Sequence, residues 1–150
     1  MNVQSIFDTL KFEHDTILGQ MKKLEADVGG TVNQAQLVRV SEQVREHFDS
    51  EEKCVYDKFA EKEKTATLLE TYEKEHSEIS EALTAIAVPS IPKSDWLKKV
   101  QDLRSKIESH FTREQNELFP QMRKAFATWE LEKIQDAFVN QRKGKQSQAA

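Results

Sequence analysis

Apolar residues recur at every third or fourth position along most of the chain, which is the spacing of one face of an α-helix. Few stretches alternate between apolar and polar residues in the way that a half-buried strand requires. Glycine, proline and charged residues interrupt the helical pattern and mark the connections. The pattern therefore predicts five helices, at about residues 4–28, 33–59, 66–87, 94–127 and 128–141.

Hydroxyl and proline residues indicate where some of these helices begin and end. We expect Ser94 and Thr128 to be N-caps, because a hydroxyl oxygen there accepts a hydrogen bond from the first turn. Pro120 lacks a backbone N–H, so we expect it to kink the fourth helix or to end it early. Residues 143–150 are polar and small, and we expect a frayed, flexible tail there.

Four long amphipathic helices joined by short links are typical of an antiparallel four-helix bundle. We therefore expect an all-α fold, with the bundle over about residues 4–127 and a short fifth helix over 128–141. A chain of 150 residues is long enough for one hydrophobic core, so we expect a single domain over residues 1–150. The residues expected to pack the fifth helix on the outside of the bundle are Trp129, Ile134 and Phe138.

Charge and composition argue against several classes of protein. The net charge is −4 at pH 7, so no overall basic character indicates a nucleic-acid partner. Cys54 is the single cysteine, which excludes an internal disulfide framework and a paired-cysteine metal site. No apolar run is long enough to cross a membrane, and the N-terminus lacks the pattern of a signal peptide. We therefore expect a cytoplasmic protein that binds neither nucleic acid nor membrane.

All four histidines fall on apolar stripes, each on a different predicted helix. Two of them are followed four residues later by a glutamate, and residues i and i+4 share one face of a helix. A carboxylate at a core position is costly unless it is paired or binds a metal. The candidate metal ligands are therefore His14, His47, Glu51, His76, His110 and Glu114.

These residues repeat along the chain. His76 follows His14 by 62 residues, and His110 follows His47 by 63 residues. A phenylalanine comes directly after both His47 and His110. The chain is therefore interpreted as two helical hairpins, each of which contributes one His and then a His with a Glu. Packed with approximate two-fold symmetry, the hairpins would bring four imidazoles and two carboxylates together.

Imidazole and carboxylate together suit iron, manganese or zinc better than magnesium or calcium, which prefer oxygen ligands alone. Six side chains exceed the needs of one tetrahedral zinc ion, so two metal ions fit better. Glu51 and Glu114 could each bridge both ions, with two histidines on each ion. Coordination positions would then remain for water, oxide, peroxide or dioxygen.

A simpler interpretation treats each of these residues as an ordinary core residue. A buried histidine is more often hydrogen-bonded than bound to a metal, and a buried glutamate can pair with Arg or Lys. For the whole set, this interpretation requires every histidine of the chain and two carboxylates to face inward without a common cause. The dinuclear metal site is therefore the preferred hypothesis.

The neighbours of these residues carry weaker signals. Tyr72 lies one helical turn before the third histidine, so we expect it to reach the same cavity as a neighbour of the metal site. Acidic residues close to the histidines could accept imidazole hydrogen bonds, but adjacent positions face elsewhere on a helix, so exposure is expected instead. The residues expected to be exposed are Asp15, Glu52, Glu75 and Glu117, and the residue expected to serve packing alone is Tyr56.

The sequence around these residues resembles the hemerythrin-like family of HHE cation-binding domains. The stretches His47-Phe48-x-x-Glu51-Glu52 and His110-Phe111-x-x-Glu114 match the repeated motif of that family. Glu13-His14-Asp15 and Glu75-His76 match its positions on the first and third helices. The resemblance covers about residues 5–127.

This resemblance implies an up-down four-helix bundle around a non-haem centre of two iron ions with carboxylate and oxo bridges (Fe–O–Fe). Zinc or manganese could substitute for iron. The chain differs from the oxygen-carrying branch of the family at Tyr72, where those proteins have a fifth histidine, and at Glu114, where they have an aspartate at a longer spacing. The implied assignment is His14 and His47 on one iron, His76 and His110 on the other, and Glu51 and Glu114 as bridges.

The expected function follows from that resemblance. We expect a di-iron protein that binds dioxygen or a related small ligand, for sensing, storage or detoxification of oxygen or iron. One alternative is a di-iron enzyme that acts on peroxide or nitric oxide at the same centre. A second alternative is an interaction module that the metal stabilises without catalysis, with a protein partner or a second copy of the chain still open.

Overall fold

The computed structural model describes residues 5–26, 31–63, 67–87 and 91–149, with side chains described outside 31–33 and 145–149. No strand occurs in these ranges, which confirms the all-α prediction. None of the helices in them is both long and apolar enough to span a membrane. The elements are α1 (Ile6–Ala26), α2 (Thr31–Glu51), η1 (Glu52–Tyr56), α3 (Asp57–Lys62), α4 (Thr67–Ile86), α5 (Lys93–Arg113), η2 (Glu114–Leu118), α6 (Phe119–Ala125) and α7 (Thr128–Ala149).

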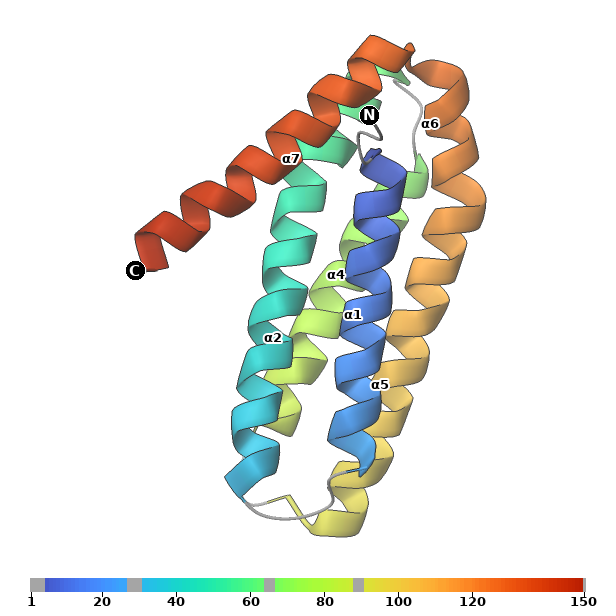
Figure 1. Ribbon diagram of the computed structural model, residues 1–150. Helices are drawn as coiled ribbons and strands as arrows, with labels where there is room; N and C mark the ends of the chain where they lie inside the picture. Colours follow the sequence, from blue (N-terminus) through green and yellow to red (C-terminus); the bar gives the residue numbers. More distant parts are fainter. Residues whose placement is uncertain (1–4, 27–30, 64–66, 88–90, 150) are drawn as a thin grey trace.

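The long helices α1, α2, α4 and α5 lie side by side (Figure 1). Helix α1 contacts α2 and α5, and helix α4 contacts the same two helices, so the four surround a shared interior. Helix α7 lies obliquely against one end of this group and contacts α1, α2 and η1 (Figure 1). The interior between the four long helices is therefore the place where their apolar stripes meet.

Two five-residue π-helical segments interrupt what would otherwise be continuous α-helices. Segment η1 links α2 to α3, and η2 links α5 to α6. An i→i+5 hydrogen bond closes each wide turn, from the Asp57 N–H to the Glu52 carbonyl and from the Phe119 N–H to the Glu114 carbonyl. The prediction of two uninterrupted α-helices is wrong in this detail, because a repeat of three and four residues does not reveal an inserted π turn.

Buried apolar side chains form two clusters, and a polar layer lies between them. On α1, Leu10 belongs to the first cluster and Ile17 to the second, with the buried His14 between them. Helix α4 has the same order around its own histidine, with Tyr72 in the first cluster and Ile79 in the second. The fold therefore places one polar layer in the middle of the helical group and seals it on both sides.

The expected cap at Ser94 is wrong, and so is the expectation that Pro120 ends the fourth predicted helix, while a kink at Pro120 stays a prediction. Helix α5 begins at Lys93 with Pro92 at its N-cap position, so Ser94 lies inside the first turn and does not cap the helix. The extended backbone of Pro92 (φ −56°, ψ 143°) leads the chain directly into the helix. Pro120 does not end the helix either, because it lies in the first turn of α6, where a missing N–H is tolerated.

Helix α7 is longer than the predicted fifth helix. Its backbone continues through residue 149, so the predicted end of the helix at about residue 141 is wrong, while fraying of residues 143–149 stays a prediction. Lysine, glutamine and alanine are good helix formers, and Gly144 and Ser147 are the weaker residues there. Thr128 is the first helical residue and not the cap, since Glu130 accepts the hydrogen bond of the Ala127 N–H at 2.9 Å.

The packing of α7 confirms part of the prediction. Ile134 is 4% exposed and Phe138 is 1% exposed, so both anchor the helix in the first apolar cluster. Trp129 is 59% exposed, which contradicts the expectation that it packs on the bundle. The Lys133 ammonium lies 5.1 Å from the centre of its ring instead.

We predict that Phe138→Ala destabilises the folded chain by about 3–5 kcal/mol, because it removes a buried ring and leaves a cavity. Trp129→Ala is the matched control and should change the free energy of unfolding by less than about 0.5 kcal/mol. Chemical denaturation followed by circular dichroism measures both variants. Equal losses would contradict the packing of α7 described above.

Candidate metal centre

Six polar side chains meet in the layer between the two apolar clusters. All six are buried, and the most exposed of them, His76, is 3% exposed. They form two groups of four, and within each group the candidate ligand atoms all lie within 4.8 Å of one another. The structure thus brings together all the residues that the sequence singled out. This His/Glu cluster consists of His14, His47, Glu51, His76, His110 and Glu114.

Each histidine uses its Nδ1 atom for a hydrogen bond that points away from the cluster. Three of the partners are carboxylates, which only accept hydrogen bonds, so these rings carry their proton on Nδ1. The Nε2 atoms therefore turn their lone pairs inward, as metal-binding histidines do. The pairs are His14–Gln115 (2.8 Å), His47–Glu13 (2.8 Å), His76–Glu52 (3.0 Å) and His110–Glu75 (2.9 Å).

The inward atoms divide into two sets of four, and each glutamate gives one oxygen to each set. Within a set, each imidazole nitrogen lies 3.3 to 3.6 Å from a carboxylate oxygen. These distances exceed the usual hydrogen-bond range of about 2.7–3.2 Å. Position A consists of His14 Nε2, His47 Nε2, Glu51 Oε2 and Glu114 Oε1. Position B consists of His76 Nε2, His110 Nε2, Glu51 Oε1 and Glu114 Oε2.

Several of these buried atoms lack suitable hydrogen-bond partners. Within the described part of the chain, all four atoms of position A have none. In position B, the Nε2 atoms of His76 and His110 lie 3.0 Å apart, although both rings carry their proton on the other nitrogen. Two lone pairs at this distance repel each other unless a cation or a proton lies near both. The donor set therefore fits a metal ion at each position, since imidazole and carboxylate are ligands of iron, manganese and zinc.

Phenylalanine rings flank the cluster on two sides. Phe111 stacks on His14 with ring centres 3.8 Å apart, and Phe48 stacks on His76 with ring centres 3.7 Å apart. Phe48 and Phe111 each follow a histidine of the repeat, and each stacks on a histidine of the other hairpin. The two halves of the repeat therefore make equivalent ring contacts. The rings keep the surroundings apolar, which strengthens electrostatic interactions inside the cluster.

Burial and neighbouring charges shift the pKa of four residues of the cluster. Burial lowers the pKa of His47 to about 4, although the hydrogen bond to Glu13 acts in the opposite direction, and it also lowers the pKa of His110. Burial and the adjacent Glu114 carboxylate raise the pKa of Glu51 well above its usual value. For Glu114, burial acts to raise the pKa, but the hydrogen bond from Glu51 and the nearby imidazoles hold it well below its usual value.

Tyr56 belongs to this cluster, and the expectation that it serves packing alone is wrong. Its hydroxyl lies 2.6 Å from Glu114 Oε2, 3.0 Å from Glu51 Oε1 and 3.3 Å from His76 Nε2. The π turn of η1 explains the contact, because it brings residue i+5 nearer to the face of residue i than an α-helical turn does. Under an α-helical spacing, a tyrosine five residues after Glu51 faces elsewhere, so the sequence pattern concealed it.

Tyr72 touches the cluster through its ring. The ring lies edge-on to His110 with centres 5.4 Å apart, and the hydroxyl donates a hydrogen bond to the Arg113 carbonyl at 3.3 Å. Tyr72 is thus next to a candidate ligand, as expected, but its hydroxyl is bound to the backbone. A role at the metal stays a prediction.

The expected exposure of four acidic residues is confirmed for two of them. Asp15 and Glu117 are exposed. The Glu75 side chain is only 17% exposed, so the expectation is wrong for it. The Glu52 side chain is 39% exposed, but like Glu75 it accepts a hydrogen bond from a histidine of the cluster. Glu75 pairs with His110 of a neighbouring helix and not with His76, its neighbour in the sequence.

Arginines hold two of the carboxylates that orient the histidines. Arg113 pairs with Glu75, and Arg142 of α7 donates to both oxygens of Glu13 at 2.9 Å. Burial acts to raise the pKa of both carboxyls, but their histidine and arginine partners lower it. Glu13 and Glu75 occupy equivalent positions in the repeat. The arginine that pairs with Glu13 comes from α7, whereas the arginine that pairs with Glu75 comes from α5.

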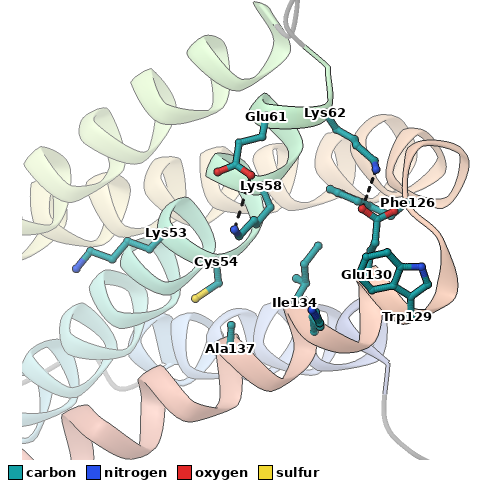
Figure 2. Close-up of a pocket in the computed structure, with 11 residues that line it drawn as sticks. Lys53, Cys54, Lys58, Glu61, Lys62, Phe126, Trp129, Glu130, Ile134 and Ala137 are labelled. Atoms are coloured by element: carbon teal, nitrogen blue, oxygen red, sulfur yellow. Dashed lines mark hydrogen bonds and ion pairs between the residues drawn. The ribbon is translucent and has the colours of Figure 1, made fainter.

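A separate groove of about 480 Å³ lies between α7 and the segment η1–α3 (Figure 2). Lysine side chains and the apolar residues Cys54, Ile134 and Ala137 line it, and an ion pair of Lys62 with Glu130 at 2.7 Å crosses it. Burial raises the pKa of the Cys54 thiol, which makes it a poor nucleophile. No residue of the His/Glu cluster lines this groove, so the candidate site is the buried polar layer.

The comparison with protein families agrees with the geometry. The family model described as "Hemerythrin HHE cation binding domain" matches residues 5–122, which confirms the resemblance noted in the sequence. No curated protein and no solved structure matches the chain significantly.

We predict that Glu51→Gln stabilises the metal-free chain above pH 7. The folded-state pKa of Glu51 is raised above its ordinary value of 4.5, so its contribution to stability is present below pH 4.5 and is lost as the pH rises through the raised pKa. Glutamine does not titrate, and the gain should be on the order of 1 kcal/mol per unit of pKa difference. Chemical denaturation with a chelator present, from pH 4.5 to pH 8, measures it. A gain that shrinks as the pH rises would contradict a raised pKa for Glu51.

Proposed function

The chain belongs to the hemerythrin family of HHE cation-binding domains, and on that premise we propose that its His/Glu cluster holds two metal ions. The observation that carries this proposal is the set of four buried, unpartnered atoms at position A, within the described residues, beside the facing lone pairs at position B. A metal ion at each position gives every one of these atoms a partner. The proposed ligands are His14 and His47 at position A, His76 and His110 at position B, and Glu51 and Glu114 at both.

We further propose that the ions are iron, with zinc or manganese as substitutes. The mixture of imidazole and carboxylate favours these metals over calcium and magnesium. We also infer that α1, α2, α4 and α5 form the antiparallel, up-down four-helix bundle expected from the family. Their mutual contacts support this inference.

The proposed function is the binding of dioxygen or a related small molecule at this centre. Two iron ions there would supply open coordination positions and electrons. The protein supplies four imidazoles that outer hydrogen bonds hold in orientation, and two carboxylates shared by both positions. The apolar clusters on both sides of the layer limit the entry of water. Such a site suits sensing, storage or detoxification.

A second candidate function is an enzyme that acts on peroxide or nitric oxide at the same centre. The Tyr56 hydroxyl favours it, because this buried donor lies among the candidate ligands and could give a proton to a small substrate. Loss of turnover, without loss of metal, in Tyr56→Phe would support the enzyme over the carrier.

We predict that His110→Ala and Glu114→Ala each reduce the metal content of the purified chain by more than half, because each removes a ligand from a shared centre. Glu117→Ala is the matched control, since Glu117 is exposed on the same helical stretch. Elemental analysis of the three variants and the parent is the measurement. Equal metal contents in all four proteins would refute the ligand assignment.

The visible spectrum of the parent before and after exposure to air separates the two levels of the proposal. Iron with charge-transfer bands that change on oxygenation would support a reactive di-iron centre. Zinc alone, with no change of spectrum, would leave the metal site standing and refute the binding of dioxygen.

A further inference from the structure

The two metal positions are related by the internal repeat but differ in their hydrogen bonds. All four atoms of position A lack a partner within the described residues. In position B, three of the four atoms lie within 3.3 Å of one hydroxyl oxygen, that of Tyr56. The Tyr56 hydroxyl therefore contacts three of the four atoms that a metal ion at position B would bind.

The asymmetry comes from one substitution between the halves of the repeat. The residue that follows Tyr56 by 63 positions is Phe119, which has no hydroxyl. The Phe119 ring lies over His14, with ring centres 6.4 Å apart, and offers no hydrogen bond to position A. Position A is therefore open to a cation, whereas position B already contains a polar group.

A second difference between the halves acts in the opposite direction. His76 of position B donates to the Glu52 carboxylate, whereas His14 of position A donates to the neutral Gln115 amide. Glu52 and Gln115 occupy equivalent places, 63 residues apart. A carboxylate behind a ligand histidine makes the imidazole a better ligand, and loss of such a partner weakens metal binding by about ten- to 100-fold. This difference favours position B.

The size of each effect on metal affinity decides whether the unpartnered atoms of position A or the Glu52 carboxylate behind position B dominates. A buried donor or acceptor without a partner weakens a folded state by about five- to 150-fold in equilibrium terms. An ion at position A gives partners to four such atoms at once. An ion at position B would relieve the repulsion between the Nε2 atoms of His76 and His110, but it must first displace the hydrogen bonds of Tyr56. The four unpartnered atoms therefore outweigh the single outer carboxylate.

We propose that the two metal ions load in sequence, position A first, and that the Tyr56 hydroxyl holds position B until the second ion displaces it. This inference rests on the proposed function, since it requires a dinuclear centre. It makes Tyr56 a positioning residue that sets the order of loading.

The first test is titration of the metal-free chain with Co²⁺, followed by visible absorption and calorimetry. We expect a tight step and a weak step whose dissociation constants differ by at least about tenfold. His14→Asn should remove the tight step and His76→Asn the weak one, with circular dichroism to check folding. The reverse assignment, or a single step for two ions in the parent, would overturn the proposal.

The second test replaces Tyr56 by phenylalanine, the residue at the equivalent position, Phe119, in the other half of the repeat. In Tyr56→Phe, position B loses its hydroxyl while Glu52 remains, so we expect the two steps to merge or to change order. The double variant Tyr56→Phe with Glu52→Gln should bind two ions with nearly equal affinities. Tyr72→Phe is the matched control and should keep the separation of the parent, because its hydroxyl is bound to the Arg113 carbonyl. An unchanged separation in Tyr56→Phe would refute the role of Tyr56.

These outcomes distinguish failure of the proposed metal centre from failure of the proposed order of loading. A chain that binds no Co²⁺ refutes the proposed metal centre and this inference together. A chain that binds two ions in one step, or at position B first, keeps the metal centre and refutes only the order of loading.

Discussion

The burial of polar atoms without partners is the constraint on which this structure depends. Four imidazole lone pairs and two carboxylates lie in one layer, and apolar clusters on both sides exclude the water that would otherwise solvate them. The apolar clusters therefore stabilise the folded chain, and the buried polar atoms of the layer between them destabilise it. A cation reverses the sign of the second effect, so the same residues that weaken the metal-free fold would strengthen the metal-bound one.

Much of this arrangement was predictable from the sequence. An inward-facing residue on an amphipathic helix is recognisable from its spacing alone, and all six residues of the His/Glu cluster were found in that way. The repeat added a relation between distant parts of the chain, which spacing on one helix does not contain. The pairing of Phe48 with His76 and of Phe111 with His14 repeats the same relation in three dimensions.

The unpredicted parts have specific physical causes. Tyr56 faces the cluster because of a π turn, and a hydrophobic period of 3.6 residues does not reveal such a turn. Glu13 and Glu75 orient histidines of other helices, so their sequence neighbours give no hint of their partners. Pattern reasoning thus located side chains relative to their own helix. It did not determine which helices are neighbours or where a helix changes its pitch.

The contact between Arg142 and Glu13 depends on the number of residues between the start of α7 and Arg142. From Thr128 to Arg142 the helix rises by about 21 Å, and each residue turns the side-chain direction by about 100°. At this register the guanidinium reaches Glu13 and, through it, His47. Adding or deleting a single residue between Thr128 and Arg142 would rotate Arg142 away from Glu13 without changing the composition of the cluster. The length of the outermost helix is therefore linked to the orientation of an imidazole in the interior.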